Sequence, residues 1–110
     1  MIEESYVSFD TAKMLKEAGF DLPCRGGYHI NRFRYEAPTQ ALAARWLREV
    51  HRIVVDATFI PPSTDGNAWR YFIGEMDDMV WNGDYVPSDE FYETYEAALE
   101  AGLQEAVKLI

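Results

Sequence analysis

The few residues of this sequence that could carry chemistry include one thiol beside a basic side chain. Cys24 is followed by Arg25 and by the glycine pair 26–27. A neighbouring guanidinium lowers the pKa of a thiol, and glycine N–H groups can stabilise an oxyanion, so the segment suggests the nucleophile of a small hydrolase or transferase. We favour a small, half-buried loop cysteine instead. The only histidines are His29 and His51, which we interpret as surface or packing residues.

Four carboxylates in the second half of the chain would form a cluster if they met around one turn. They are Glu75, Asp77, Asp78 and Asp84. Clustered carboxylates bind calcium or magnesium, but this spacing departs from the D-x-[DN]-x-[DN]-G pattern of calcium loops. We therefore interpret them as solvated turn residues. The sequence also lacks the glycine-rich patterns of phosphate-binding loops. We expect neither a metal nor a cofactor.

Arginines repeat with helical spacing near the middle of the chain. The stripe consists of Arg45, Arg48 and Arg52, and Arg25, Arg32 and Arg34 precede it. A basic stripe of this kind can contact nucleic-acid phosphates. We favour ion pairs with acids of the same helix or of the last helix, because the second half of the chain is rich in carboxylates. Nucleic acid is therefore not the partner that we expect.

Aromatic residues are concentrated after residue 68. They are Trp69, Tyr71, Trp81, Tyr85, Phe91 and Tyr92. A small sheet cannot bury all of them, and an aromatic patch with an acidic rim is typical of a protein-binding surface. The alternative is that these rings cover the open face of the sheet. Both interpretations stay open on the sequence alone.

Length and composition predict one small domain over residues 1–110. Of the 110 residues, 48% are apolar and 26% are charged, with a net charge of −9. That charge argues against nonspecific binding to nucleic acid or to an anionic membrane. One cysteine excludes an internal disulfide and a multi-cysteine zinc site. The acidic start and the lack of a long apolar run lead us to expect neither a secretory signal nor a transmembrane helix.

The net charge is unevenly distributed. Residues 1–55 carry eight basic and seven acidic side chains, a net charge of +1, whereas residues 56–110 carry two basic and twelve acidic ones, a net charge of −10. The acids alternate with aromatic residues, so a disordered acidic tail is not expected. An acidic face that keeps the protein in solution is the simplest interpretation, and a directional interaction surface is the alternative.

The first predicted helix spans Phe9 to Ala18. Ser8 or Asp10 is its predicted N-cap, since a short side-chain oxygen accepts from the free N–H groups of the first turn. Gly19 is the predicted left-handed residue that ends the helix, in a Schellman motif.

Two further helices have clear apolar stripes and N-caps at Thr39 and Thr94. The stripe of the second helix is Leu42, Ala43, Trp46, Leu47 and Val50. The stripe of the last helix is Tyr95, Ala98, Leu99, Gly102, Leu103, Ala106, Val107 and Ile110. Gly102 lies on the inward side, where a close approach by another backbone would explain a glycine in mid-helix.

Strand patterns fill the intervening segments. Residues 28–30 and 33–35 alternate with a slip between them, which fits either one bent strand or a small hairpin. Residues 53–60 and 68–76 predict two strands that pair antiparallel, and Asn82-Gly83 suggests a short hairpin at 80–86. The fold class is therefore α+β: a small, mainly antiparallel sheet of three or four strands with three helices on one face, in the order α-β-α-β-β-(β)-α.

Several stretches together resemble one group of proteins. They are residues 7–20 (VSFDTAKMLKEAGF), 37–40 (APTQ), 46–51 (WLREVH) and 94–110. These stretches are similar to uncharacterised small acidic proteins of gut anaerobic bacteria and their phages, whose members often have a longer segment before the second helix. The resemblance implies a mobile-element setting and a cytoplasmic location. The group has no assigned activity, so no site residue follows from it.

Four functions remain. The first, which we favour, is a non-enzymatic protein-interaction module, such as a phage or mobile-element accessory protein, using the aromatic residues or the arginine stripe. The second is an acidic DNA mimic or an inhibitor of a nucleic-acid enzyme, in which carboxylates replace phosphates. The third is a small enzyme using Cys24. Direct DNA binding by the arginine stripe is a weaker fourth. An uncovered sheet edge would also allow a homodimer, and we expect no membrane partner.

Overall fold

A computed structural model describes residues 4–61, 65–77 and 86–110 of the chain. Within these residues the elements are α1 (Phe9–Glu17), β1 (Gly26–Ile30), β2 (Phe33–Ala37), α2 (Gln40–Val50), β3 (Ile53–Phe59), β4 (Trp69–Glu75), β5 (Val86–Pro87) and α4 (Tyr95–Val107). The order α-β-β-α-β-β-β-α confirms the α+β class. None of the helices in the described ranges has the length and apolar character that a membrane span needs.

The three helices begin where the sequence predicts. The hydroxyl groups of Ser8, Thr39 and Thr94 accept hydrogen bonds from backbone N–H groups three residues further on. At the end of α1, the Phe20 N–H donates to the Leu15 carbonyl at 2.9 Å. Gly19 lies between them with φ of 99°. This is the predicted Schellman ending, which a residue with a Cβ would strain.

The strands divide between two sheets, whereas the sequence suggested one. The larger sheet has the order β3-β4-β5, and β3 pairs antiparallel with β4 from Ile53–Glu75 to Phe59–Trp69. A bridge between Trp69 and Tyr92 extends the pairing along β4. The suggested hairpin at 80–86 lies outside the described residues except for Val86, which pairs with Ile73 of β4.

The smaller sheet is a hairpin of β1 and β2, which settles the alternative left open for residues 28–36. Its five residue pairs run from Gly26–Ala37 to Ile30–Phe33. The two loop residues are Asn31 and Arg32, with φ of 51° and 76°. Positive φ at both central residues is the signature of a type I′ turn, whose twist matches that of the flanking strands.

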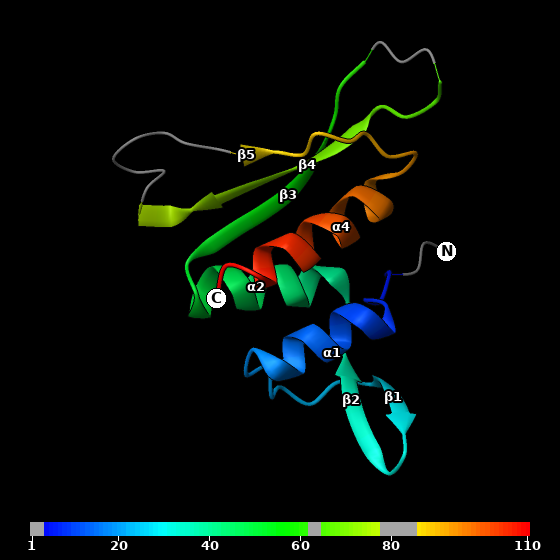
Figure 1. Cartoon of the computed structure of the whole chain (residues 1–110), viewed down its shortest axis with the longest axis vertical. Helices are drawn as coiled ribbons and strands as arrows, with labels where there is room; N and C mark the ends of the chain where they lie inside the picture. Colours follow the sequence, from blue (N-terminus) through cyan, green and yellow to red (C-terminus); the bar gives the residue numbers. More distant parts are fainter. Residues whose placement is uncertain (1–3, 62–64, 78–85) are drawn as a thin grey trace.

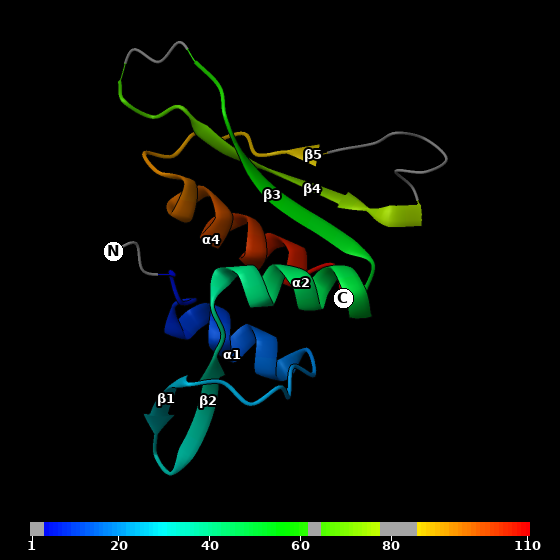
Figure 2. The ribbon, with the colours of Figure 1, turned by 180° about the vertical axis from the view of Figure 1, so that it is seen from behind.

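The helices lie between the two sheets. Figures 1 and 2 show α4 and α2 against one face of the β3-β4-β5 sheet, α1 beyond them, and the hairpin at the far end of the molecule. One cluster of buried residues joins α1, α2, α4 and β3-β4, and its fully enclosed side chains include Leu15, Leu47 and Leu103. Three residues of the predicted inward stripes are instead exposed: Val50 by 58%, Tyr95 by 38% and Ile110 by 49%. Val50 ends α2, Tyr95 begins α4, and Ile110 lies beyond the end of α4.

Gly102 faces the sheet as predicted, but its neighbours are side chains rather than another backbone. A Cβ at this position would lie 2.8 Å from Val55 Cγ2 and 2.9 Å from Tyr71 Cβ. Both distances are shorter than van der Waals contact. The glycine therefore lets α4 lie directly on β3 and β4.

Candidate functional site

The β1-β2 hairpin has one apolar face, which begins against α1. Residues opposite each other in an antiparallel pair share a face, so Tyr28 and Tyr35 lie side by side, followed by Ile30 and Phe33. The ring of Phe9 meets Tyr28 edge-on, with 5.6 Å between ring centroids, and Tyr35 at 5.3 Å. The inner half of this face is thus packed on α1.

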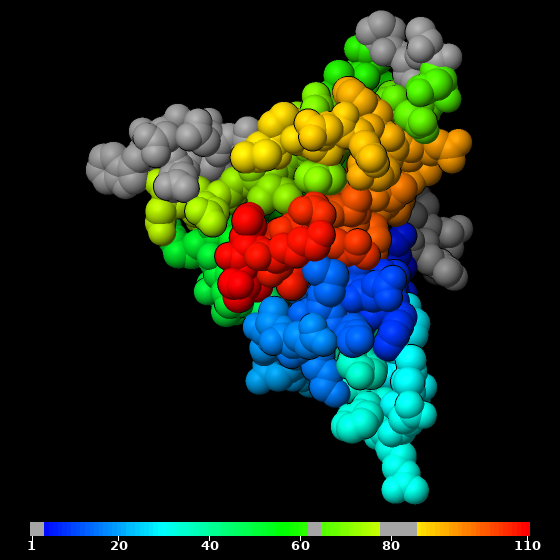
Figure 3. Space-filling view, in the orientation of Figure 1, coloured from blue at the N-terminus to red at the C-terminus, as the bar shows by residue number. Residues whose placement is uncertain are grey.

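The outer half of the same face extends beyond α1. Ile30 is 42% exposed and Phe33 is 61% exposed. We call residues 30–33 the hairpin tip. Figure 3 shows it as the end of a narrow projection from the body of the molecule. On one side the Lys16 ammonium lies 5.6 Å from the centre of the Phe33 ring.

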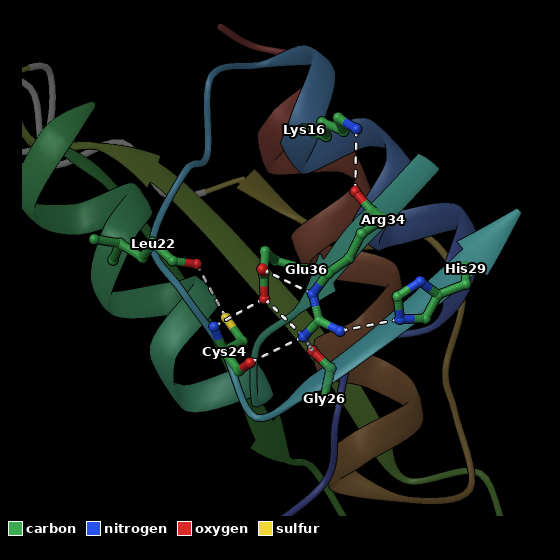
Figure 4. A network of polar contacts seen from close by, with 7 residues as sticks. All are labelled: Lys16, Leu22, Cys24, Gly26, His29, Arg34 and Glu36. Carbon is green, nitrogen blue, oxygen red and sulfur yellow. Dashed lines mark hydrogen bonds and ion pairs between the residues drawn. The ribbon is translucent and has the colours of Figure 1, made fainter. Parts of the chain in front are cut away.

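The opposite face of the hairpin is polar and is organised by Arg34 (Figure 4). The Arg34 guanidinium forms an ion pair with Glu36 at 3.0 Å. It also donates to the carbonyl oxygens of Cys24 at 3.1 Å and Gly26 at 3.3 Å. These bonds fasten β2 to the segment that leads into β1. A methyl group on Gly27 would lie 2.6 Å from the guanidinium carbon and would displace it.

Cys24 takes part in this network through its backbone more than through its thiol. Its N–H donates to Glu36 Oε2 at 2.8 Å, and its thiol donates to the Leu22 carbonyl at 3.3 Å. Burial, and then the negative charge of Glu36, raise the pKa of the Cys24 thiol, although Arg34 lowers it. These surroundings favour the protonated thiol, which is the weaker nucleophile.

The network also shifts the pKa of Glu36. The hydrogen bond from Arg34, and then that from the Cys24 N–H, lower the pKa of this carboxyl. His29 shares a hydrogen bond with Arg34 Nη1 at 3.2 Å and so belongs to the same cluster. The cluster as a whole fixes the base of the hairpin, and its groups are engaged with one another.

Two members of the predicted arginine stripe form ion pairs. Arg45 contacts Glu49 of its own helix at 3.2 Å, and Arg52 contacts Asp77 after β4 at 3.0 Å. Arg48 is exposed on α2. We expected the acid that pairs with Arg52 in α2 or in the last helix, but it is Asp77, which follows β4. Exposed pairs of this kind contribute about 0–1 kcal/mol.

Of the predicted aromatic residues that can be described, Trp69, Tyr71 and Tyr92 pack on the core, whereas Phe91 is 40% exposed and lies 4.8 Å from the Arg70 guanidinium. Trp69 and Tyr71 are half-buried and pack on the core. The Trp69 ring lies 5.7 Å from that of Tyr95, edge-on. The rings of Trp69 and Tyr71 therefore lie on the face of the sheet that α4 covers, not on its open face. Trp81 and Tyr85 lie outside the described residues.

The remaining chemical candidates come together in no obvious catalytic arrangement within the described ranges. No group of three or more His, Cys, Asp or Glu side chains there could hold a metal ion. Asp78 and Asp84 lie outside these ranges. The ring of His51 packs edge-on against Trp46, with 4.7 Å between centroids. It lines a hollow with Arg45 and Glu49, which already pair with each other.

Sequence reasoning missed the hairpin tip. The signal available was the alternation of Tyr28 and Ile30 with Phe33 and Tyr35 around an asparagine. It could indicate an apolar face but not which half of that face α1 would cover. No protein-family model, no curated protein and no solved structure matches this chain.

Proposed function

We propose that the protein is a non-enzymatic protein-binding module and that the hairpin tip is its binding element. The observation that carries the proposal is the exposure of Phe33, 61%, at the end of a projecting hairpin whose inner half is packed. Aromatic residues, Phe included, are enriched in protein interfaces relative to the rest of the surface.

Backbone conformation at the turn supports the same proposal. The second central position of a type I′ turn favours glycine, yet Arg32 occupies it with φ of 76°. A left-handed conformation costs a residue with a Cβ about 1–2 kcal/mol. Strain of this kind concentrates at functional sites, where the side chain is needed for something other than stability.

The Arg34 network supports binding by holding the hairpin in place before a partner arrives. Bonds from Arg34 to Glu36, Cys24 and Gly26 fix the strand ends, so less conformational freedom is lost on association. Lys16 lies against one side of the exposed ring, and the exposed Arg32 precedes Phe33 in the chain. The partner surface that fits this tip is apolar at its centre and acidic at its rim.

We further propose a cytoplasmic accessory protein of a phage or mobile element. The free thiol of Cys24 fits a reducing compartment. The setting depends on the resemblance of residues 7–20 and 94–110 to proteins of bacteria and their phages.

Site-specific photo-crosslinking tests the proposal. Benzoylphenylalanine replaces Phe33 in one variant and Val50 in a matched control, whose side chain is 58% exposed on α2. After irradiation in cells, we expect a discrete protein adduct from position 33 that is absent from position 50. Adding Ile30→Ser to the first variant should reduce this adduct several-fold. Identical adducts at both positions, or none at position 33, would overturn the proposal.

A further inference from the structure

A second surface of the molecule is both apolar and acidic, as we expect for a surface that binds the hairpin tip. A hollow of about 450 Å³ lies between the end of α4 and strands β4 and β5. Its lining includes Tyr71, Ile73, Val86, Leu109, Glu75 and Glu105. We call this hollow the acidic groove. Its volume lies within the range of about 300–1,000 Å³ that is typical of small-ligand sites, and it can receive a large side chain.

The acidic groove combines an apolar floor with negatively charged side chains. Burial, and then the nearby charge of Glu105, raise the pKa of Tyr71, so the field of this carboxylate reaches the hollow. Glu105 also pairs with Lys108 at 2.8 Å, but the two side chains are 47% and 60% exposed. Such a pair is weak and can exchange for another cation.

Another, larger hollow among the described residues is less negatively charged. It has a volume of about 630 Å³ and lies between the end of α1 and α2. Its lining places the cation of Arg45 beside the carboxylates of Asp21 and Glu49, whereas the described lining of the acidic groove has two carboxylates and no cation. An aromatic side chain with an adjacent cation therefore fits the acidic groove better.

We propose that the acidic groove binds the hairpin tip of a second copy of this chain. In this contact Phe33 enters the groove, and Arg32 lies beside Glu75 and Glu105. The inference rests on the proposed function of the tip. It agrees with the uneven charge, because the tip belongs to the half with a net charge of +1 and the groove to the half with −10.

The tip and the groove occupy different parts of the surface. In Figures 1 and 2, α1 lies between the hairpin and the elements that line the groove. Each copy therefore offers both halves of the contact, and copies can add head to tail.

Pairing through the free edge of β3 is the less favourable route to self-association. The Ile60 N–H donates to Ala68 and the Arg52 carbonyl accepts from Met76, the residues on either side of β4. By alternation along β3, the Ala57 N–H therefore faces the open edge. That N–H donates to the carboxylate of Asp56 at 2.8 Å. A charged side chain bound to an edge N–H hinders the addition of another strand.

Sedimentation equilibrium of the purified protein tests the inference with two complementary variants. The tip variant carries Arg32→Glu and Phe33→Ser, and the groove variant carries Glu75→Lys and Glu105→Lys. The wild type should have an average mass above that of the monomer, rising with concentration. Each variant alone should be monomeric. Their equimolar mixture should form a heterodimer that grows no further, because one intact tip and one intact groove remain.

A matched control carries Arg48→Glu and Val50→Ser on α2 and should associate like the wild type. Circular dichroism melts establish that all variants fold, and Glu75→Gln with Glu105→Gln replaces the lysine variant if it does not. A monomeric wild type at every concentration would overturn this inference while leaving crosslinking of another protein at position 33 intact. Association unaffected by the tip variant, or a mixture without heterodimer, would overturn it as well.

Discussion

At the residue scale, Gly102 shows how one missing methyl group sets the distance between a helix and a sheet. Its contacts with Val55 and Tyr71 leave no room for a Cβ. Overpacking costs about 1–3 kcal/mol, whereas alanine gains about 1 kcal/mol over glycine in a helix. We expect Gly102→Ala to lower the free energy of unfolding in urea titrations. An increase would show that α4 and the sheet can separate without loss.

Glu36 makes the hairpin base sensitive to acid. Because Arg34 and the Cys24 N–H lower the pKa of Glu36 in the folded protein, its ionised form stabilises the fold. That contribution is fully present above the ordinary carboxyl pKa of about 4.3 and is lost as the pH falls through the lower folded value. Hydrogen-exchange protection of the Cys24 amide should therefore decrease in acid.

Glu36→Gln is the comparison for this pH dependence. The variant should protect the Cys24 amide less than the wild type at pH 7, and the two should converge once the pH falls below the lowered pKa of Glu36 in the folded protein. If the difference in protection between the wild type and Glu36→Gln were the same at pH 7 and in acid, the role assigned to the Glu36 carboxylate would be contradicted.

The residues that sequence reasoning placed correctly are those whose partners are close along the chain. The N-caps Ser8, Thr39 and Thr94 bond three residues ahead, and Gly19 ends α1 through its own conformation. The Arg34 network was not predicted, because it joins residues as far as 12 positions apart, such as Cys24 and Glu36, and depends on the strand register. Val55 against Gly102 was missed for the same reason.

At the element scale, we expect the Arg32 side chain of the hairpin turn to lower the stability of the hairpin and to strengthen self-association. Arg32→Gly removes a side chain from a position with φ of 76°. We expect it to stabilise the hairpin by up to about 1 kcal/mol, because glycine adopts this conformation without strain. The same substitution should weaken self-association several-fold, because it removes the cation that faces the acidic groove.

A variant that is more stable than the wild type but associates more weakly would show that the Arg32 side chain has a binding role. Thermal unfolding and sedimentation measure stability and association on the same sample. A variant that is more stable and associates as well as the wild type would show that the Arg32 side chain has no binding role.

Helices and the β3-β4 pair were predictable from periodicity, since each element buries one regular stripe. The hairpin was left open because Asn31-Arg32 lacks the glycine that usually identifies a type I′ turn. Its separation from the larger sheet could not be predicted, because it depends on α1, α2 and α4 filling the space between the two sheets.

At the scale of the whole molecule, the uneven charge predicted from the sequence becomes a separation between a tip with exposed cations and a groove with two carboxylates. A contact of this kind has an apolar part, from Phe33, and an ionic part, from Arg32. Salt distinguishes them. The Debye length falls from about 10 Å at 0.1 M salt to about 3 Å at 1 M, and apolar burial is not screened.

Arg32→Gln should therefore weaken self-association several-fold at low salt and by less than about twofold near 1 M salt, where exposed ionic contacts are screened. Phe33→Ala should weaken it at both concentrations. Arg48→Gln is the control, since it removes the same charge from an exposed position on α2 and changes only the general repulsion between copies. If Arg32→Gln and Arg48→Gln had the same effect at low salt, Arg32 would contribute through net charge alone and would not face Glu75 and Glu105.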